Sequence, residues 1–152
     1  MKLIALLILI ILSLFGCNKS GNNQVPNKEE GPIRIEAGFM CGWGAGEDSL
    51  YITNSIIKYV YYVPAQSRLP KIKKTRITTD TEWENILNSL NTGYFLKLNY
   101  NTCNVCVDGC DEWISIQDDQ MSHKIRFDQG LKIDSLNKLQ TILEQFRSEF
   151  RR

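Results

Sequence analysis

Three cysteines within eight residues are the first place in this sequence to look for chemistry. Cys103, Cys106 and Cys110 follow the spacing C-x2-C-x3-C, and Cys41 lies far upstream. Four thiolates can hold a zinc ion tetrahedrally, a C-x-x-C pair at the start of a helix can exchange disulfides, and four cysteines can also form two structural disulfides. Which of these chemistries applies depends on the compartment that the chain occupies.

The N-terminus predicts export. After Met1 and Lys2 comes an unbroken apolar run, residues 3–14, and these 12 residues are too few to cross ~30 Å of hydrocarbon as a helix. A positive start, a short apolar core and then small residues are typical of a signal peptide, which we place at residues 1–16.

The residues that follow the apolar run predict a lipid anchor. Leu14-Phe15-Gly16-Cys17 resembles the bacterial lipobox, in which the cysteine receives lipid, although Phe15 departs from the usual small or β-branched residue. Several acyl chains on Cys17 would hold the protein at a membrane, because each buried methylene contributes about 0.8 kcal/mol. Asn18 in place of Asp favours the outer membrane of the cell envelope. An ordinary secretory signal and a permanent anchor helix are the alternatives.

Composition then divides the rest of the chain. Residues 17–32 contain no aromatic residue and only one aliphatic side chain after Cys17, Val25, so we expect a flexible tether there. Residues 33–152 are enough for one modest core and form a single predicted domain. The formal net charge of the whole chain is only +1 at pH 7, which gives no sign of a nucleic-acid partner.

Export favours oxidised cysteines, so the chain is expected to contain two structural disulfides and no metal or other cofactor. We predict the pairs Cys41–Cys103 and Cys106–Cys110, the second closing a turn at Asp108-Gly109. A four-cysteine zinc site and a thiol-redox site are the alternatives.

Hydrophobic periodicity predicts an α+β fold. Alternating segments at residues 33–36, 49–53, 56–63, 71–77, 113–117 and 124–128 indicate strands. Thr79 and Glu82 fit a capping box at the start of a first helix, for which Gly93 is a plausible stop. A second helix is expected from Asp134, with Leu136, Leu139, Leu143, Phe146 and Phe150 on its buried face. We expect an antiparallel sheet of about five to seven strands with two helices on one face, and the order of elements also suggests two strand–strand–helix units.

No catalytic constellation is evident, and we predict that the protein is not an enzyme. His123 is the only histidine and has no nucleophile near it in sequence. The carboxylates near the cysteines do not follow the ligand order of an EF-hand. The Gly-rich segment at residues 39–48 lacks the Gly-Lys-Ser/Thr of a phosphate-binding loop, and we interpret it as a loop that carries Trp43.

Several stretches resemble known families. GFMCGWGAGEDSLYI, TDTEWENILNSL, CNVCVDGCDEWISI and HKIRFDQG are similar to small lipoproteins of Bacteroidetes-type bacteria, which implies secretion and lipidation. The Gly-rich hairpin at residues 42–46 and Asp111-Glu112-Trp113 also resemble emfourin-type inhibitors of thermolysin-like proteases, although the cysteines and the tether depart from that pattern.

These features predict a lipid-anchored, non-catalytic binding module of the envelope with a protein as its partner, and the second resemblance suggests an inhibitor-like domain. Its predicted binding residues lie in the Trp43 loop and in the turn that the cysteines form: Trp43, Gly44, Asp108, Asp111 and Trp113. A rigid exposed loop is preorganised for contact. A metal or redox protein, and a purely structural lipoprotein, remain alternatives.

Overall fold

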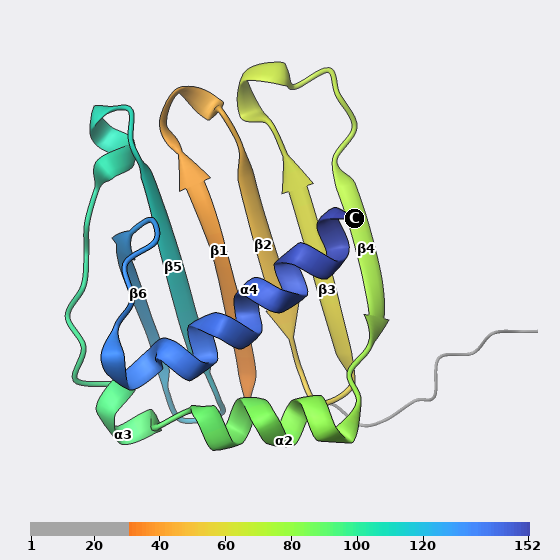
Figure 1. The fold of residues 1–152 in the computed structure, drawn as a ribbon, viewed down its shortest axis with the longest axis vertical. Coiled ribbons are helices and arrows are strands. Elements are labelled where there is room, and N and C mark those ends of the chain that lie inside the picture. The colour runs from red at the N-terminus through yellow and green to blue at the C-terminus, as the bar shows by residue number, and fades with distance from the viewer. Residues whose placement is uncertain (1–30) are drawn as a thin grey trace, which may run out of the picture.

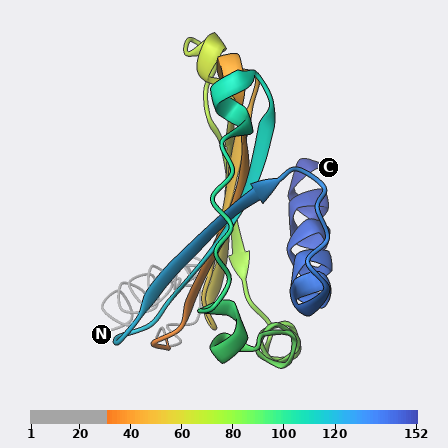
Figure 2. The same cartoon turned by 90° about the vertical axis from the view of Figure 1, so that its left-hand side faces the viewer.

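A six-stranded antiparallel sheet with helices on one face is the framework of the protein (Figures 1 and 2). The computed structural model describes residues 31–152. The predicted signal peptide, Cys17 and nearly all of the predicted tether lie outside the described residues. The predicted α+β class, with an antiparallel sheet and two longer helices packed on one face, is confirmed.

The strands form a meander to which a hairpin is added. They are β1 (Arg34–Cys41), β2 (Glu47–Ile52), β3 (Ile56–Tyr62), β4 (Ile72–Ile77), β5 (Cys110–Gln117) and β6 (Ser122–Asp128). Their order across the sheet is β4-β3-β2-β1-β5-β6, so β5 returns to pair with β1 at the free edge of the meander. Only the second half of the chain is a strand–strand–helix unit, because the first half places four strands before its helix.

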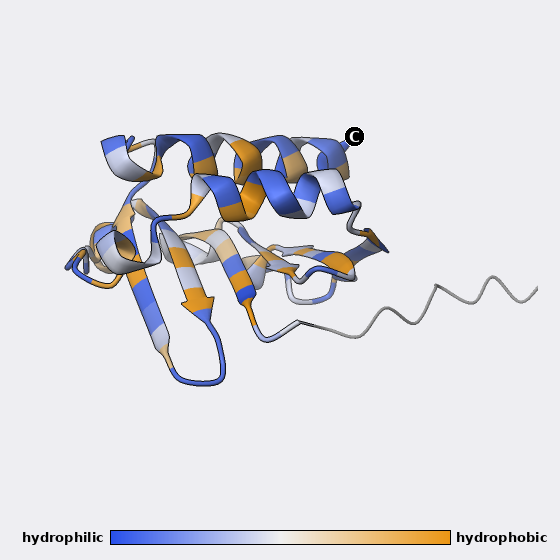
Figure 3. Ribbon diagram, turned by 90° about the horizontal axis from the view of Figure 1, so that it is seen from below, coloured by the Kyte–Doolittle hydropathy of each residue, from blue (hydrophilic) through white to orange (hydrophobic). Residues whose placement is uncertain are grey.

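Alternation along the strands separates a buried face from an open one. Ile35 of β1 lies opposite Ile52 of β2 and Ile116 of β5, and all three side chains are fully buried. The residues between them on each strand point to the other face, as the two-residue period of a strand requires. An antiparallel sheet can leave one face in water in this way. Figure 3 shows the helices as one layer and the sheet as the next, with hydrophilic and hydrophobic residues alternating along the strands.

The first helix, α2 (Asp80–Ser89), begins as predicted and ends earlier. Thr79 and Glu82 form a complete capping box. The helix stops at Ser89 because Leu90 is extended, and Asn91 then caps the short α3 (Thr92–Phe95). The prediction that Gly93 stops the first helix was therefore wrong, since Gly93 lies inside α3.

The long helix α4 (Asn137–Arg151) covers the buried face of the sheet. A 3-10 turn, Asp134–Leu136, precedes it, so the α-helix begins three residues after the predicted Asp134. The predicted apolar stripe is buried: Leu136, Leu139, Leu143, Phe146 and Phe150. Figure 1 shows α4 crossing the strands diagonally, with its C-terminal end above β3 and β4.

A buried carboxylate joins the C-terminal half of α4 to the sheet. The side chain of Asp48 on β2 is fully buried, and it accepts hydrogen bonds from Arg151 Nη2 at 2.7 Å and from Arg147 Nε at 3.2 Å. The Tyr59 hydroxyl on β3 donates to the same carboxylate oxygen at 3.3 Å. Burial raises the pKa of Tyr59, and the charge of Asp48 acts in the same direction. This neutral hydroxyl and two guanidinium groups together satisfy a charge that would be costly to bury alone.

Arg76 ties the edge strand β4 to both helices. Its guanidinium donates two hydrogen bonds to Glu82 of α2, at 2.8 and 2.9 Å, and two to Glu149 of α4, at 2.8 and 2.9 Å. It also lies over the ring of Phe146, 5.2 Å from the centroid. Burial acts to raise the pKa of Glu82, but the hydrogen bonds from Arg76 and Thr79 outweigh it and the pKa is lowered.

We predict that Arg76→Gln lowers the free energy of unfolding by about 1–3 kcal/mol, because it removes charge-assisted hydrogen bonds to the partly buried Glu82 and to the exposed Glu149. Lys73→Gln removes the same charge from the same strand at an exposed position and should change stability by less than about 0.5 kcal/mol. Urea denaturation followed by circular dichroism measures both. Equal effects of the two changes would show that Arg76 acts only through net charge.

Candidate binding surface

The structure contains two disulfides but not the predicted pairs. Cys41 is bonded to Cys110, and Cys103 is bonded to Cys106. The prediction of two bridges is confirmed, and the pairing Cys41–Cys103 with Cys106–Cys110 was wrong. The strand register gives the reason: Cys41 ends β1 directly opposite Cys110 at the start of β5, with 4.1 Å between the Cα atoms. Cys103 directly precedes the 3-10 turn Asn104–Val107, and Cys106 lies within it.

Three loops meet at the end of the sheet that lies farthest from α2, and we call their exposed surface the tip (Figure 1). They are the β1–β2 connection with its 3-10 turn Gly42–Gly44, the 3-10 turn Asn104–Val107, and the β3–β4 connection that begins with Pro64–Gln66. Each carries one apolar side chain in water: Trp43 is 82% exposed, Val107 77% and Leu69 57%.

The first two loops are fixed to one another. Besides the Cys41–Cys110 bridge, the amide of Gly42 donates to the carbonyl of Gly109 at 2.9 Å. The third loop approaches closely as well, since a Cβ at Gly44 would lie 2.6 Å from the amide nitrogen of Ala65. The tip is therefore a preformed surface built from segments distant in sequence.

The backbone beneath the tip adopts the left-handed conformation at three points. Trp43, Gly44 and Asp108 have φ values of 55°, 66° and 67°. For a residue with a Cβ this conformation costs roughly 1–2 kcal/mol. Burial of the Trp43 ring does not offset this cost, because the side chain lies mostly in water. An exposed aromatic residue on strained backbone motivates the hypothesis of a contact role.

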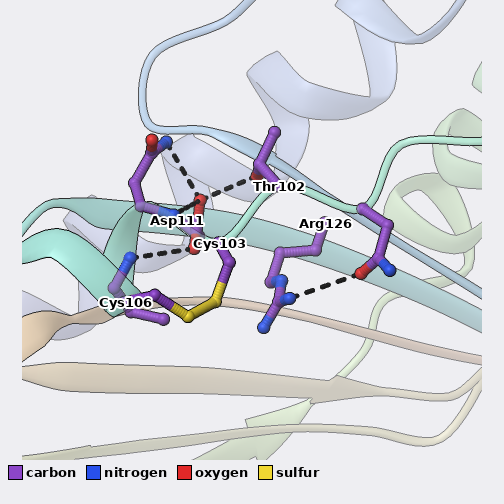
Figure 4. The surroundings of a disulfide bond; sticks show 8 residues. Thr102, Cys103, Cys106, Asp111 and Arg126 are labelled. Atoms are coloured by element: carbon purple, nitrogen blue, oxygen red, sulfur yellow. Dashed lines mark hydrogen bonds between the residues drawn. A yellow bond between two sulfur atoms is a disulfide. The ribbon is translucent and has the colours of Figure 1, made fainter.

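Asp111 supports the tip from inside and does not reach its surface. Its buried carboxylate accepts hydrogen bonds from the Thr102 hydroxyl at 2.7 Å, from the amide and side chain of Asn104 at 3.2 and 3.1 Å, and from the Val105 amide at 3.3 Å (Figure 4). Burial acts to raise the pKa of Asp111, but these bonds, together with the charge of Arg126, outweigh it and lower the pKa. The carboxylate is thus held ionised and orders the Cys103–Cys106 turn.

Trp113 also lies away from the tip. It stands opposite Gly38 and Arg126 in the middle of the sheet, and by alternation with the buried Ile114 it points to the open face. The ammonium group of Lys124 lies 4.0 Å from the centre of its ring. Of the five predicted binding residues, the structure brings together only Trp43, Gly44 and Asp108 at the tip.

Two tip residues were not among the predicted ones. Val107 and Leu69 are apolar residues within the short turn segments VDG and SRLP. An apolar residue next to turn residues is visible in the sequence and indicates an exposed apolar side chain. The order of the strands in the sheet then brings Val107 and Leu69 to the same end as Trp43.

The other candidate groups for chemistry are engaged in the fold. His123 bonds through Nε2 with the carbonyl oxygen of Leu98 at 2.9 Å and packs edge-on against Phe95. The four sulfurs of Cys41, Cys103, Cys106 and Cys110 are in disulfides, and a thiolate zinc site or a dithiol would require their reduction. Within residues 31–152 no cluster of three histidine, cysteine or carboxylate side chains has a spacing suited to a metal ion.

No protein-family model matches the chain, and no curated protein is significantly similar to it. Within the part of the chain that the structure describes, none of the helices combines the length and apolarity needed to cross a bilayer.

The disulfide pairing predicts a specific peptide map. A protease that cleaves before aspartate cuts between Cys106 and Cys110 at Asp108. Without reduction, the fragment Asp108-Gly109-Cys110 should remain attached to the peptide that contains Cys41, while Cys103 and Cys106 stay within one peptide. Mass spectrometry distinguishes this from the two other pairings, in both of which the fragment joins the Cys103–Cys106 peptide.

Proposed function

We propose that the protein is an exported, lipid-anchored and non-catalytic binding module, and that its tip contacts a protein partner in the cell envelope. The observation that carries this proposal is the pair of exposed side chains, Trp43 and Val107, on two loops that a disulfide and a backbone hydrogen bond hold together. Tryptophan is enriched among residues that dominate binding energy at protein interfaces.

Preorganisation supports a role in binding. Association costs conformational entropy wherever a loop must be ordered, and a loop held in place before the encounter avoids that cost. The tip meets this condition through the Cys41–Cys110 bridge and the buried carboxylate of Asp111.

The direction of β1 also favours this surface. β1 starts at the end of the sheet near α2 and runs toward the tip (Figure 1). A tether that joins Cys17 to β1 therefore enters the domain at the end farthest from the tip. A domain held by lipid at Cys17 would have the tip free to face away from the anchoring membrane.

For the anchor, we predict that Cys17→Ser abolishes acylation. Cells fed an alkyne-bearing fatty acid should label the wild-type protein and not the variant, and the variant should no longer partition into the detergent phase of a Triton X-114 extract. Asn18→Ala, next to the same residue, serves as the control and should keep its label. Labelling that persists in Cys17→Ser would contradict the anchor, independently of what the tip binds.

For the tip, we predict that a photoreactive phenylalanine analogue at position 43 or position 107 forms the same protein adduct in intact cells. The analogue at Tyr94, an aromatic position 46% exposed near the opposite end, is the matched control. In binding assays with the purified partner, Trp43→Ala should weaken affinity about 30-fold, the effect of losing about 2 kcal/mol at a hot spot. Tyr94→Ala should leave affinity unchanged.

A tip without a role in binding would give no shared adduct at positions 43 and 107, or equal adducts at position 94. The emfourin-like features of the sequence make a secreted thermolysin-like metalloprotease one specific partner to include in these assays. Inhibition of such a protease that is lost in Trp43→Ala would identify the partner class.

A further inference from the structure

A second concave surface lies on the helix side of the sheet, beyond the C-terminal end of α4. Because α4 crosses the strands diagonally, it leaves the tip-proximal ends of β1, β3 and β4 uncovered on this side (Figure 1). The resulting groove has a volume of about 600 Å³. The groove is separate from the tip, because no residue of the three tip turns lines it.

The floor of the groove is aromatic and apolar because of the strand register. Tyr61 of β3 lies opposite Ile72 of β4 and Asp48 of β2, and Asp48 lies opposite Phe39 of β1. The rings of Phe39 and Tyr61 are partly exposed, and Ile72 is 47% exposed. Tyr59 and Phe150, whose rings stack in parallel with 5.5 Å between their centroids, close the end nearest α4.

The rim of the groove is cationic. Lys74, Arg151 and Arg152 line it, and no aspartate or glutamate does. Two acidic groups lie next to the floor. Asp48 is buried and bonded to Arg147 and Arg151, and Glu112, opposite Phe39 on β5, lies 3.5 Å from Arg147 Nη1. Arg151 is half exposed, so its guanidinium binds Asp48 on one side while still facing the solvent.

The ammonium group of Lys74 is fixed in place, since it donates to the carbonyl oxygen of Phe150 at 2.6 Å. Burial acts to lower the pKa of Arg151, but hydrogen bonds with Tyr59 and Asp48 outweigh it and raise the pKa. Arg151 therefore keeps its positive charge at physiological pH.

We propose that this groove is a binding site for a small organic anion with a flat apolar body, such as an aryl carboxylate or aryl sulfonate. The body would lie against Phe39 and Tyr61, and the anionic group would lie between Lys74 and the two C-terminal arginines. An apolar pocket with a few convergent charged groups is the usual form of a small-molecule site. Planar guanidinium groups match the geometry of carboxylate and sulfonate oxygens.

A matched pair of photoreactive probes tests this site on the full chain held in lipid nanodiscs. One probe is a benzoate that carries a trifluoromethyl diazirine, and the other is the corresponding benzyl alcohol, which has the same body without the charge. The benzoate should label peptides that contain Phe39, Tyr61 or Phe150 in a saturable manner. Naphthalene-2-sulfonate should compete with it, and the alcohol should label these peptides several times less.

The double variant Lys74→Gln with Arg152→Gln should weaken benzoate labelling roughly three- to tenfold, the effect expected of two exposed charges that contact the same ligand. Lys73→Gln with Lys97→Gln removes the same charge at exposed positions away from the groove and should leave labelling unchanged. Near-ultraviolet circular dichroism verifies that all variants are folded. Competition on the wild-type chain provides a readout that needs no variant.

Equal labelling by the benzoate and the alcohol would overturn the proposal, as would adducts that map to the tip or to the open face of the sheet. Labelling that the rim substitutions leave unchanged would do the same. Trp43→Ala should not affect the groove, so the failure of this site and the failure of the tip as a partner surface are separate outcomes.

Discussion

The packing of α4 across one face of the sheet is the constraint on which the rest of the structure depends. The helix buries Leu139, Leu143, Phe146 and Phe150 against the strands, and removal of this apolar area from water is the main force available to a domain of this size. Ion pairs fix the direction of the C-terminal half of α4, since Arg147 and Arg151 both bond to the buried carboxylate of Asp48. A buried charge becomes destabilising when it loses a partner. A change in the angle at which α4 crosses the strands would break these ion pairs and is therefore unfavourable.

That crossing divides the surface into regions with different properties. The diagonal path of α4 leaves the tip-proximal ends of the strands uncovered, and aromatic side chains meet the cationic rim there. The contacts that join the tip loops do not include α4: they are a disulfide between neighbouring strands and the hydrogen bonds of Asp111. A module built in this way can hold two rigid surfaces on a single small core.

Local patterns were enough to predict most of the secondary structure. The capping box at Thr79 and Glu82 and the apolar stripe of the last helix depend on neighbours within one or two turns, so the sequence displays them directly. The end of α2 was harder to predict, since Leu90 and Asn91 end that helix and start another before Gly93 is reached. Asp111 appeared to be a surface carboxylate because turns favour aspartate, and nothing in its neighbourhood indicates that the chain folds over it.

The class of fold, the buried face of the last helix and the presence of paired cysteines could be predicted from the sequence, because periodicity and composition are properties of local sequence. The pairing of the cysteines, the meeting of apolar side chains at the tip and the position of the groove follow from the three-dimensional fold, because all three depend on strand register. The pairing of β5 with β1 sets Cys41 against Cys110, and the successive pairing of β1, β2, β3 and β4 sets Phe39, Asp48, Tyr61 and Ile72 in one row across the sheet. These contacts join residues far apart along the chain, and their free energy depends on a sheet that must first assemble.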